Sequence, residues 1–290
     1  MTEILRRTPT GELKWALAQL FDRSAPTYER VGVSHFDALG RQLVERAGLR
    51  ESERVLDVGC GTGAVLVPAA LAVGPHGSVT GVDLSPGMVE RAREAIAEQG
   101  LTQARAVVGD AETAEWTDAD GTATGPADGS FDAVLAGISL FFFPHPDAAA
   151  ARYRTLLAPG GRLAVSWWGR PDARWDPVFA ASAPYGAASA HRLPDDSPFR
   201  SVDALHSLLA DSGFTGAETV ETDCVTRFQG PRQWWRWVWS TAGRQFWESV
   251  PDGARGEATA AVNAELDRLR APDGSLTSVN KVRFTVARAV

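Results

Sequence analysis

The residues with the clearest potential for chemistry form a glycine-rich turn. Gly59, Gly61 and Gly63 alternate after the apolar run at residues 55–58, which is typical of a buried parallel strand, and a helix-like run follows them. Glycine allows positive φ and close approach of a ligand, and a helix N-terminus offers unpaired N–H groups. The pattern predicts a ligand-binding turn. Asp57 lies at the carboxyl end of the strand, where it can accept a hydrogen bond from an ammonium or hydroxyl group.

Two further strand-like runs end in acidic residues. The run at residues 79–83 ends at Asp83, 20 residues after Gly63, as binding of a ribose diol requires. The run at residues 107–110 ends at Asp110. These acids predict a nucleotide-like cofactor beside the turn. The glycine spacing also fits the dinucleotide fingerprint loosely, so a nicotinamide-dependent oxidoreductase stays an alternative.

Five sequence blocks point to one enzyme family. They lie at residues 55–63, 81–88, 109–112, 131–134 and 157–161. In this order and spacing they resemble the class I S-adenosylmethionine-dependent methyltransferases. Within that family the chain looks most like the branch that includes the ubiquinone and menaquinone biosynthesis enzymes. The resemblance implies S-adenosylmethionine as the cofactor and methyl transfer as the reaction.

The resemblance also implies roles for individual residues. Asp83 is expected to bind the ribose hydroxyls, and Asp110 with the Ala111 N–H to read the adenine edge. Tyr28 is expected near the cofactor, and the alternative is a plain surface position. Met88 is expected to face the adenine pocket, and the alternative is ordinary core packing. The predicted cofactor-binding set is Asp57, Gly59, Gly61, Gly63, Asp83, Leu84, Met88, Asp110, Ala111 and Tyr28.

The segment after the fourth predicted strand is the first candidate for the acceptor pocket. In open α/β sheets, ligands bind beyond the carboxyl ends of the strands, which is where residues 137–145 fall. We therefore predict that Ser139, Phe141 and Phe142 line this pocket.

Two histidines are candidates for a general base, which is needed only if the acceptor arrives protonated. His145 lies just beyond the fourth strand, and His35 opens the second helix of the N-terminal segment. No set of His, Cys, Asp and Glu residues has metal-ligand spacing, which predicts a metal-independent enzyme.

A second pocket candidate is rich in tryptophan. Five of the ten tryptophans fall within residues 234–247. One helical stripe contains Trp235 and Trp239 together with Val238, Ala242 and Phe246. We predict that Trp235 and Trp239 line the acceptor pocket as part of a cap. A helix packed on the flank of the sheet is the alternative, and an interfacial membrane helix is disfavoured because its surroundings are not strongly basic.

The strand-like and helix-like runs that must position these residues alternate along the chain, which indicates an α/β fold. We expect a Rossmann-like, seven-stranded, doubly wound sheet, mostly parallel, with the last strand antiparallel by resemblance. Residues 112–130 are polar and predict a solvated loop. One methyltransferase domain is expected over residues 1–290. Its parts are a helical leader at 1–50, a cofactor-binding core at 51–169, an irregular insertion at 170–201 and an aromatic-rich cap insertion at 229–276.

Composition limits the partners and the compartment. The net charge of −7 disfavours nucleic acid, and two cysteines give no disulfide framework, which fits a reducing cytoplasm. There is no signal-peptide pattern, and the longest apolar stretch is far shorter than the ~20 residues of a membrane span.

These observations predict a cytoplasmic methyltransferase that acts on a small apolar or aromatic acceptor at oxygen, nitrogen or carbon. The alternative is a protein of the same fold that binds S-adenosylmethionine without methyl transfer, as a cyclase or a binding module. The oligomeric state stays open.

Overall fold

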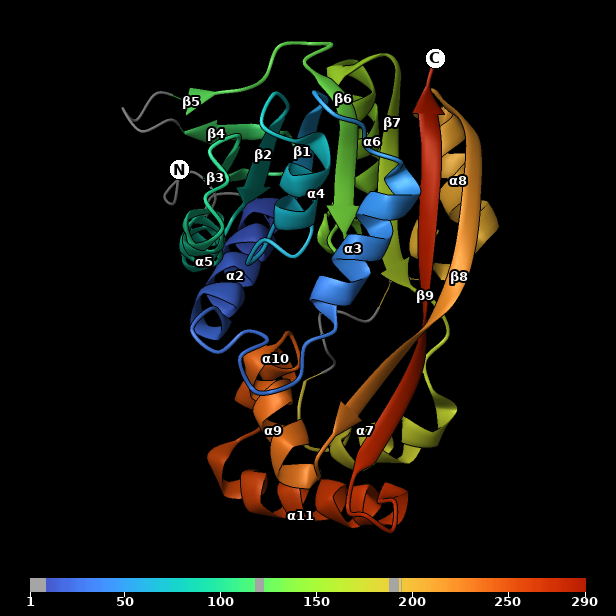
Figure 1. The fold of residues 1–290 in the computed structure, drawn as a ribbon. Helices are drawn as coiled ribbons and strands as arrows, with labels where there is room; N and C mark the ends of the chain where they lie inside the picture. The colour runs from blue at the N-terminus through green and yellow to red at the C-terminus, as the bar shows by residue number, and fades with distance from the viewer. Residues whose placement is uncertain (1–8, 118–122, 188–192, 194) are drawn as a thin grey trace.

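A twisted β-sheet runs through the centre of the computed structural model, which describes residues 9–117, 123–187, 193 and 195–290 (Figure 1). Nine strands of the described residues form this sheet, in the order β5-β4-β3-β2-β1-β6-β7-β9-β8. Strands β3, β2, β1, β6 and β7 run parallel, whereas β9 is antiparallel to both β7 and β8. The bounds are β1 Arg54–Val58, β2 Ser78–Asp83, β3 Ala104–Asp110, β4 Glu115–Thr117, β5 Ala123–Thr124, β6 Phe131–Gly137, β7 Leu157–Trp168, β8 Phe214–Phe228 and β9 Leu276–Ala289.

The α/β fold and its Rossmann-like sheet are confirmed, but the predicted number of seven strands is wrong. Two short strands, β4 and β5, extend the sheet beyond β3, where we expected a solvated loop. Gly109 of β3 pairs with Trp116 of β4, and a Cβ on Gly109 would lie 2.7 Å from the Cβ of Trp116. Trp116 is buried here, and the missing side chain of Gly109 leaves the room that this pairing needs.

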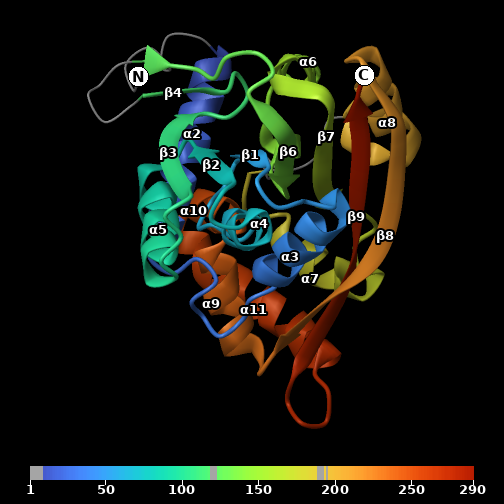
Figure 2. The same cartoon turned by 45° about the horizontal axis from the view of Figure 1, so that its top comes forward.

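Helices cover both faces of the sheet (Figures 1 and 2). Helices α3, α4 and α5 contribute to one apolar cluster, and α6 and α8 to another on the opposite face. Successive side chains of β1 alternate between them, with Val55 in the first cluster and Leu56 in the second. The helix bounds are α2 Pro9–Ser24, α3 Phe36–Ala47, α4 Leu66–Val73, α5 Pro86–Glu98, α6 Pro146–Leu156, α7 Asp176–Ser182, α8 Val202–Asp211, α9 Pro231–Ser240, α10 Arg244–Ser249 and α11 Asp252–Leu269.

The paired strands β8 and β9 form a long ribbon whose far end reaches a separate group of helices (Figure 1). Helices α9, α10 and α11 lie between these two strands in the sequence, and α7 packs against α11. Together they bury a third apolar cluster, which includes Trp175, Phe228, Trp234 and Trp247.

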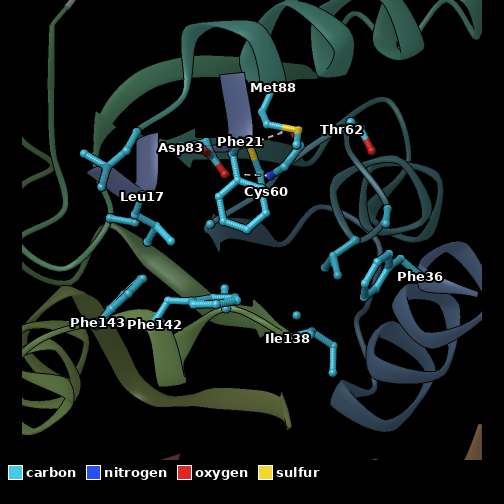
Figure 3. A pocket seen from close by; sticks show the side chains of 18 of the residues that line it. Leu17, Phe21, Phe36, Cys60, Thr62, Asp83, Met88, Ile138, Phe142 and Phe143 are labelled. Carbon is cyan, nitrogen blue, oxygen red and sulfur yellow. Dashed lines mark hydrogen bonds between the residues drawn. The ribbon is translucent and has the colours of Figure 1, made fainter. Parts of the chain in front are cut away.

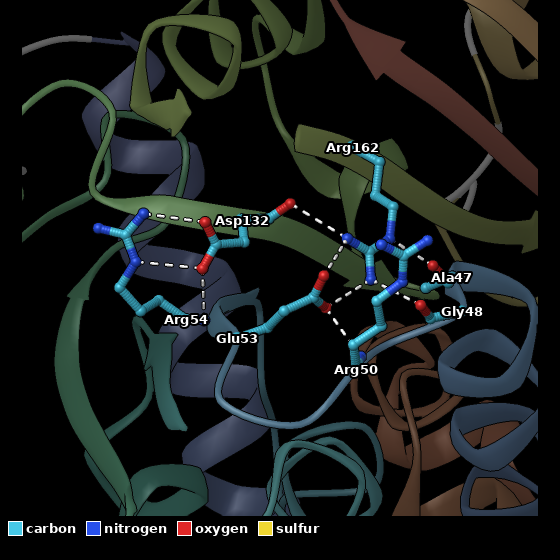
Figure 4. A network of polar contacts seen from close by, with 7 residues as sticks. All are labelled: Ala47, Gly48, Arg50, Glu53, Arg54, Asp132 and Arg162. Atoms are coloured by element: carbon cyan, nitrogen blue, oxygen red, sulfur yellow. Dashed lines mark hydrogen bonds and ion pairs between the residues drawn. The ribbon is translucent and has the colours of Figure 1, made fainter. Parts of the chain in front are cut away.

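A buried arginine ties the end of α3 to the sheet (Figure 4). The Arg162 guanidinium on β7 donates to both carboxylate oxygens of Glu53, at 3.0 and 2.6 Å. It also donates to the carbonyl oxygens of Ala47 and Gly48, where α3 ends. Arg162 is only 7% exposed, so this network satisfies orphan carbonyls of the helix terminus without access to bulk water.

Candidate functional site

The glycine turn after β1 has the positive φ angles that its sequence predicts. They are +70° at Gly59, +52° at Gly61 and +98° at Gly63. A Cβ on Gly59 would lie 2.5 Å from that of Ser139, so packing requires glycine there. A Cβ on Gly61 would meet no atom of the described residues within 4 Å. Gly61 therefore exposes bare backbone to open space.

Asp83 at the end of β2 holds this turn in place. Its Oδ2 accepts the Gly61 N–H at 2.9 Å, and its Oδ1 accepts the Ser85 N–H at 2.9 Å. Burial raises the pKa of Asp83, and these two N–H groups offset part of the rise. Ser85 in turn caps α5 by accepting the Met88 N–H at 3.1 Å. One carboxylate thus links the turn to the start of the next helix.

A cavity, which we name the turn cavity, opens beside Gly61 (Figure 3). It brings together most of the predicted cofactor residues and also two residues that we predicted for the acceptor pocket, Ser139 and Phe142. The Ser139 hydroxyl donates to the Val58 carbonyl oxygen at 2.6 Å. The predicted residues on its wall are Tyr28, Gly59, Gly61, Asp83, Leu84, Met88, Asp110, Ala111, Ser139 and Phe142.

Two predicted cofactor residues lie outside this wall. The position where Gly63 would carry a Cβ faces Val67 and Ala92, so this glycine belongs to the packing of the turn. Asp57 is fully buried, and neither carboxylate oxygen makes a hydrogen bond of good geometry within the described residues. Burial and the neighbouring Asp83 raise the pKa of Asp57 to about 8, although the Leu66 N–H lowers it slightly.

Asp57→Asn should therefore raise the free energy of unfolding of the ligand-free protein, and this gain over the parent should grow as the pH rises. The pKa of Asp57 is higher in the folded than in the unfolded protein, so folding favours its protonated, neutral form. The stability that this form contributes is lost as the carboxyl group ionises with the pH rising toward about 8. At about 1.4 kcal/mol per pKa unit, the gain above pH 8 amounts to a few kcal/mol, and it should be small below pH 4. Thermal unfolding across this range measures it. Asp132→Asn is the control of opposite sign, because Arg54 lowers the pKa of Asp132.

Helix α2 closes the turn cavity from the N-terminal side, and the side chains that it contributes to the wall were not predicted from the sequence. The Lys14 ammonium lies 2.8 Å from Asp110 Oδ2 and 2.9 Å from Glu112 Oε1. Burial lowers the pKa of Lys14, but the hydrogen bonds to both carboxylates outweigh it and raise the pKa overall. Asp22 accepts from Ser85 Oγ at 2.5 Å. Their helical spacing is the sequence feature that could have identified the residues that α2 places on the cavity wall, Lys14, Leu17, Ala18 and Phe21.

A second cavity of about 430 Å³, which we name the aromatic cavity, adjoins the first. Its wall is built from the start of α3, the end of β7, helices α7 and α9, and the far end of the β8–β9 ribbon. Polar atoms come from short side chains such as Thr226 and Asn280. Its aromatic residues are Phe21, Tyr28, His35, Phe36, Phe142, Trp168, Trp175, Phe179, Phe228, Trp234 and Trp237.

Five residues belong to the walls of both cavities, so the two cavities meet. One of the five, Ile138, has a φ of +52°, which is rare for a β-branched residue. Its N–H donates to Ser166, with 3.1 Å to the hydroxyl and 3.0 Å to the carbonyl oxygen. Ser166 thus holds a strained backbone at the junction. The shared residues are Phe21, Tyr28, Phe36, Ile138 and Phe142.

Trp235 and Trp239, which we predicted for the acceptor pocket, lie outside the wall of the aromatic cavity, although Ala242 of the same stripe lines it. Trp235 Nε1 donates to Asn263 Oδ1 on α11 at 2.8 Å. Trp239 lies beside Arg244, whose guanidinium carbon is 5.8 Å from the ring centroid. The opposite stripe, with Trp234 and Trp237, lines the cavity instead. Helix α9 carries tryptophan on several sides, so its periodicity alone could not identify the face that meets the cavity.

Phe141 and His145 also lie outside both cavity walls. The Phe141 ring packs edge-on against Phe199, with centroids 6.1 Å apart. His145 is exposed at the start of α6, and its backbone N–H donates to Glu112 Oε2 at 3.0 Å. This position gives no support to the prediction that His145 is a general base.

His35 lies on the wall of the aromatic cavity. Its ring centroid is 4.2 Å from that of Phe36, 5.8 Å from Trp237 and 6.0 Å from Trp168. Burial lowers its pKa to about 4. Glu29 fixes this segment by accepting the N–H groups of His35 and Phe36.

Within the residues that the structure describes, no group of three or more His, Cys, Asp or Glu side chains is arranged to hold a metal ion. None of the helices in the same ranges combines the length and apolar character needed to cross a membrane.

Comparisons with known proteins agree on one family. A family profile described as a methyltransferase domain matches residues 55–161. The nocamycin O-methyltransferase of Saccharothrix syringae is 34% identical over 285 residues, which is 93% of this chain and 97% of that protein. The aklanonic acid methyltransferase of Streptomyces sp. (strain C5) is 44% identical over 153 residues, 53% of this chain and 65% of that protein.

Solved structures share the fold at low sequence identity. The YcgJ protein from Bacillus subtilis has a TM-score of 0.56 at 18% identity, with 87% of this chain and 97% of that chain covered. The [4+2]-cyclase SpnF has a TM-score of 0.53 at 22% identity, with 92% and 95% covered. With a relative that matches nearly the whole length, the chain belongs to the S-adenosylmethionine-dependent methyltransferases, and S-adenosylmethionine is its cofactor.

Proposed function

We propose that the enzyme transfers a methyl group from S-adenosylmethionine in the turn cavity to an oxygen of a small aromatic molecule in the aromatic cavity. The observation that carries this proposal is the junction of the two cavities, whose walls share Phe21, Tyr28, Phe36, Ile138 and Phe142. A methyl group at the junction can pass to the acceptor without entering bulk water.

The turn cavity has features that fit the cofactor. The open side of Gly61 leaves room for a ligand against the backbone. Asp83, Asp110 and Ala111 lie on the cavity wall. In this proposal the Asp83 carboxylate binds the ribose hydroxyls, and Asp110 with Ala111 binds the adenine edge. Met88 and Leu84 supply apolar surface. When bound, the cofactor supplies an electrophilic methyl group on a positively charged sulfur.

The protein's contribution is then to orient the acceptor and to exclude water. Good orientation alone can account for ~7–11 kcal/mol of a reaction barrier. The aromatic rings around the junction serve both purposes, because they stack on a flat acceptor and leave little room for water. In this proposal, residues 229–276 cap the acceptor through Trp234 and Trp237.

The acceptor class follows from the cavity and from the relatives' names. About 430 Å³ falls within the range of small-molecule sites, and the wall is mostly aromatic. The relatives are named as an O-methyltransferase of nocamycin and a methyltransferase of aklanonic acid. Oxygen is therefore the acceptor atom that we propose.

The test is to incubate the protein and cofactor labelled in its methyl group with extracts of the producing cell. Label should enter a small molecule soluble in organic solvent, with S-adenosylhomocysteine released in equal amount. Cofactor binding without release in any extract would instead favour the non-methylating alternative.

Phe179→Ala should raise the KM for the acceptor about 10-fold and leave cofactor affinity unchanged. Phe179 lines the aromatic cavity yet is 57% exposed, so its loss removes contact area with the acceptor at little cost in stability. Leu71→Ala is the matched control, since Leu71 is 60% exposed and lies outside both cavity walls. Unchanged acceptor kinetics in Phe179→Ala would place the acceptor elsewhere.

A further inference from the structure

We propose that the acceptor carries a carbonyl oxygen at the end remote from the oxygen that receives the methyl group. Ser278 and Asn280 on the β8–β9 ribbon donate hydrogen bonds to this carbonyl and so select the acceptors that have it. This inference rests on the proposed function, because it takes the aromatic cavity as the acceptor site.

One face of the ribbon contributes a floor to the aromatic cavity (Figure 1). Side chains at every second position of a strand share a face, and residues directly opposite each other in a strand pair lie side by side on it. Three successive opposite pairs therefore share this face: Phe228 with Leu276, Thr226 with Ser278, and Cys224 with Asn280.

The apolar clusters on either side show which way this face points. Along β9, Leu276 is buried in the third apolar cluster, whereas Val282 and Phe284 are buried in the cluster that includes α3. Ser278 and Asn280 occupy the alternate positions between them, and both line the aromatic cavity. Their side chains thus project from the same face into the gap between two apolar clusters, which is where the cavity lies.

The hydrogen bonds of these two side chains leave donors in reserve. Asn280 Oδ1 accepts the Asp172 N–H at 3.0 Å, and Asn280 Nδ2 donates to Ser278 Oγ at 3.1 Å. An amide nitrogen carries two hydrogens and a hydroxyl carries one. The contacts of the described residues use one hydrogen of Asn280 and leave that of Ser278 available. Two neighbouring donors fit a carbonyl oxygen, which accepts two hydrogen bonds.

Packing alone gives no reason for polar side chains at these positions. A polar group taken out of water costs free energy unless it is hydrogen-bonded, so an apolar residue would join the two clusters more favourably. Ser278 is 9% exposed and pairs with Thr226, which also lines the cavity. The polar floor therefore fits a polar group on the acceptor.

The floor lies well away from the junction of the two cavities. Ser166, which holds Ile138 at the junction, pairs with Phe284 of β9. From that level, Asn280 lies ~13 Å and Ser278 ~20 Å along the strand, at about 3.3 Å per residue. An acceptor with one oxygen at the junction and a carbonyl at the floor must hold the two on the order of 10 Å apart, after allowing about 3 Å for each hydrogen bond. Two fused rings with groups at opposite ends provide such a separation.

The binding test compares two flat probes of the same shape, 6-acetyl-2-naphthol and 6-isopropenyl-2-naphthol. In the second probe a CH₂ group replaces the carbonyl oxygen. Calorimetry measures the affinity of each for the full-length protein saturated with S-adenosylhomocysteine. We expect the acetyl probe to bind at least about 10-fold more tightly, because a site built to hydrogen-bond a ligand group rejects the analogue that lacks it. A purely apolar site would prefer the isopropenyl probe, which loses no hydration on binding.

Variants of the floor separate recognition from packing. Ser278→Ala should weaken binding of the acetyl probe about 10-fold and leave the affinity for the isopropenyl probe unchanged. A merely structural role would instead weaken both probes equally. Thr277→Val is the matched control, because Thr277 lies on the opposite face of β9 and outside both cavity walls. It should keep the full preference for the acetyl probe.

Three results would overturn the inference: equal affinity for the two probes, no binding of either, or an unchanged preference in Ser278→Ala. Each of them leaves the proposed function standing if labelled methyl still enters a small molecule. Failure of S-adenosylhomocysteine to bind would reject the proposed function, and this inference with it.

Discussion

Gly61→Ala should lower the affinity for S-adenosylmethionine at least about 100-fold, which is about 2.7 kcal/mol, while the protein still folds. The reason is the direction of the new methyl group. It would project from a backbone with φ of +52° into the open space of the turn cavity, where the cofactor is expected to lie. The left-handed conformation itself costs an alanine ~1–2 kcal/mol, which should lower Tm by a few degrees. Calorimetry and thermal unfolding measure the two effects separately.

Gly100→Ala is the control for backbone strain. Gly100 follows α5 with φ of +64°, and a Cβ there would also meet no described atom within 4 Å. It lies outside both cavity walls, so its alanine variant should lose similar stability and keep full cofactor affinity. Equal affinity in the two variants would show that the cofactor does not lie against this turn.

Arg162→Ala should lower the free energy of unfolding by ~3–5 kcal/mol, the typical cost of removing one partner of a buried ion pair. The variant leaves the Glu53 carboxylate, whose side chain is 16% exposed, without its cation. It also leaves the Ala47 and Gly48 carbonyl groups at the end of α3 without a donor (Figure 4). Denaturant unfolding measures the change.

Arg227→Ala supplies the comparison for an exposed ion pair. Arg227 bonds to Asp273 at 2.6 Å, but both side chains are more than half exposed. Such pairs contribute ~0–1 kcal/mol because water screens them. Similar losses from the Arg162 and Arg227 variants would mean that burial does not set the strength of the Arg162 network.

The sequence was most informative where function depends on adjacent residues. The turn at Gly59 and Gly61 and the acid at Asp83 are local patterns, and each meets the same cavity. The five-strand parallel core was predictable for the same reason, since each strand reads as a short apolar run. Trp116 was missed because its burial depends on Gly109 in a different strand.

Residues that act across long sequence distances could not be predicted in this way. Lys14 reaches Asp110 from 96 positions away, and only the docking of α2 reveals the pair. The sequence likewise could not show which of the two candidate bases, His35 or His145, lies beside a cavity. Both follow plausible elements, but one ring is enclosed by aromatic side chains and the other is exposed.

The insertion of helices between β8 and β9 allows the aromatic cavity to change in sequence independently of the glycine turn. Helices α9, α10 and α11 form one uninterrupted stretch of sequence between Phe228 and Leu276, and Trp234 and Trp237 belong to it. The glycine turn is encoded far upstream. After a gene duplication, recombination within this stretch can therefore remodel the aromatic cavity while every strand of the parallel core keeps its sequence. Lineages of such enzymes are expected to diversify fastest here, with new acceptors arising on an unchanged cofactor site.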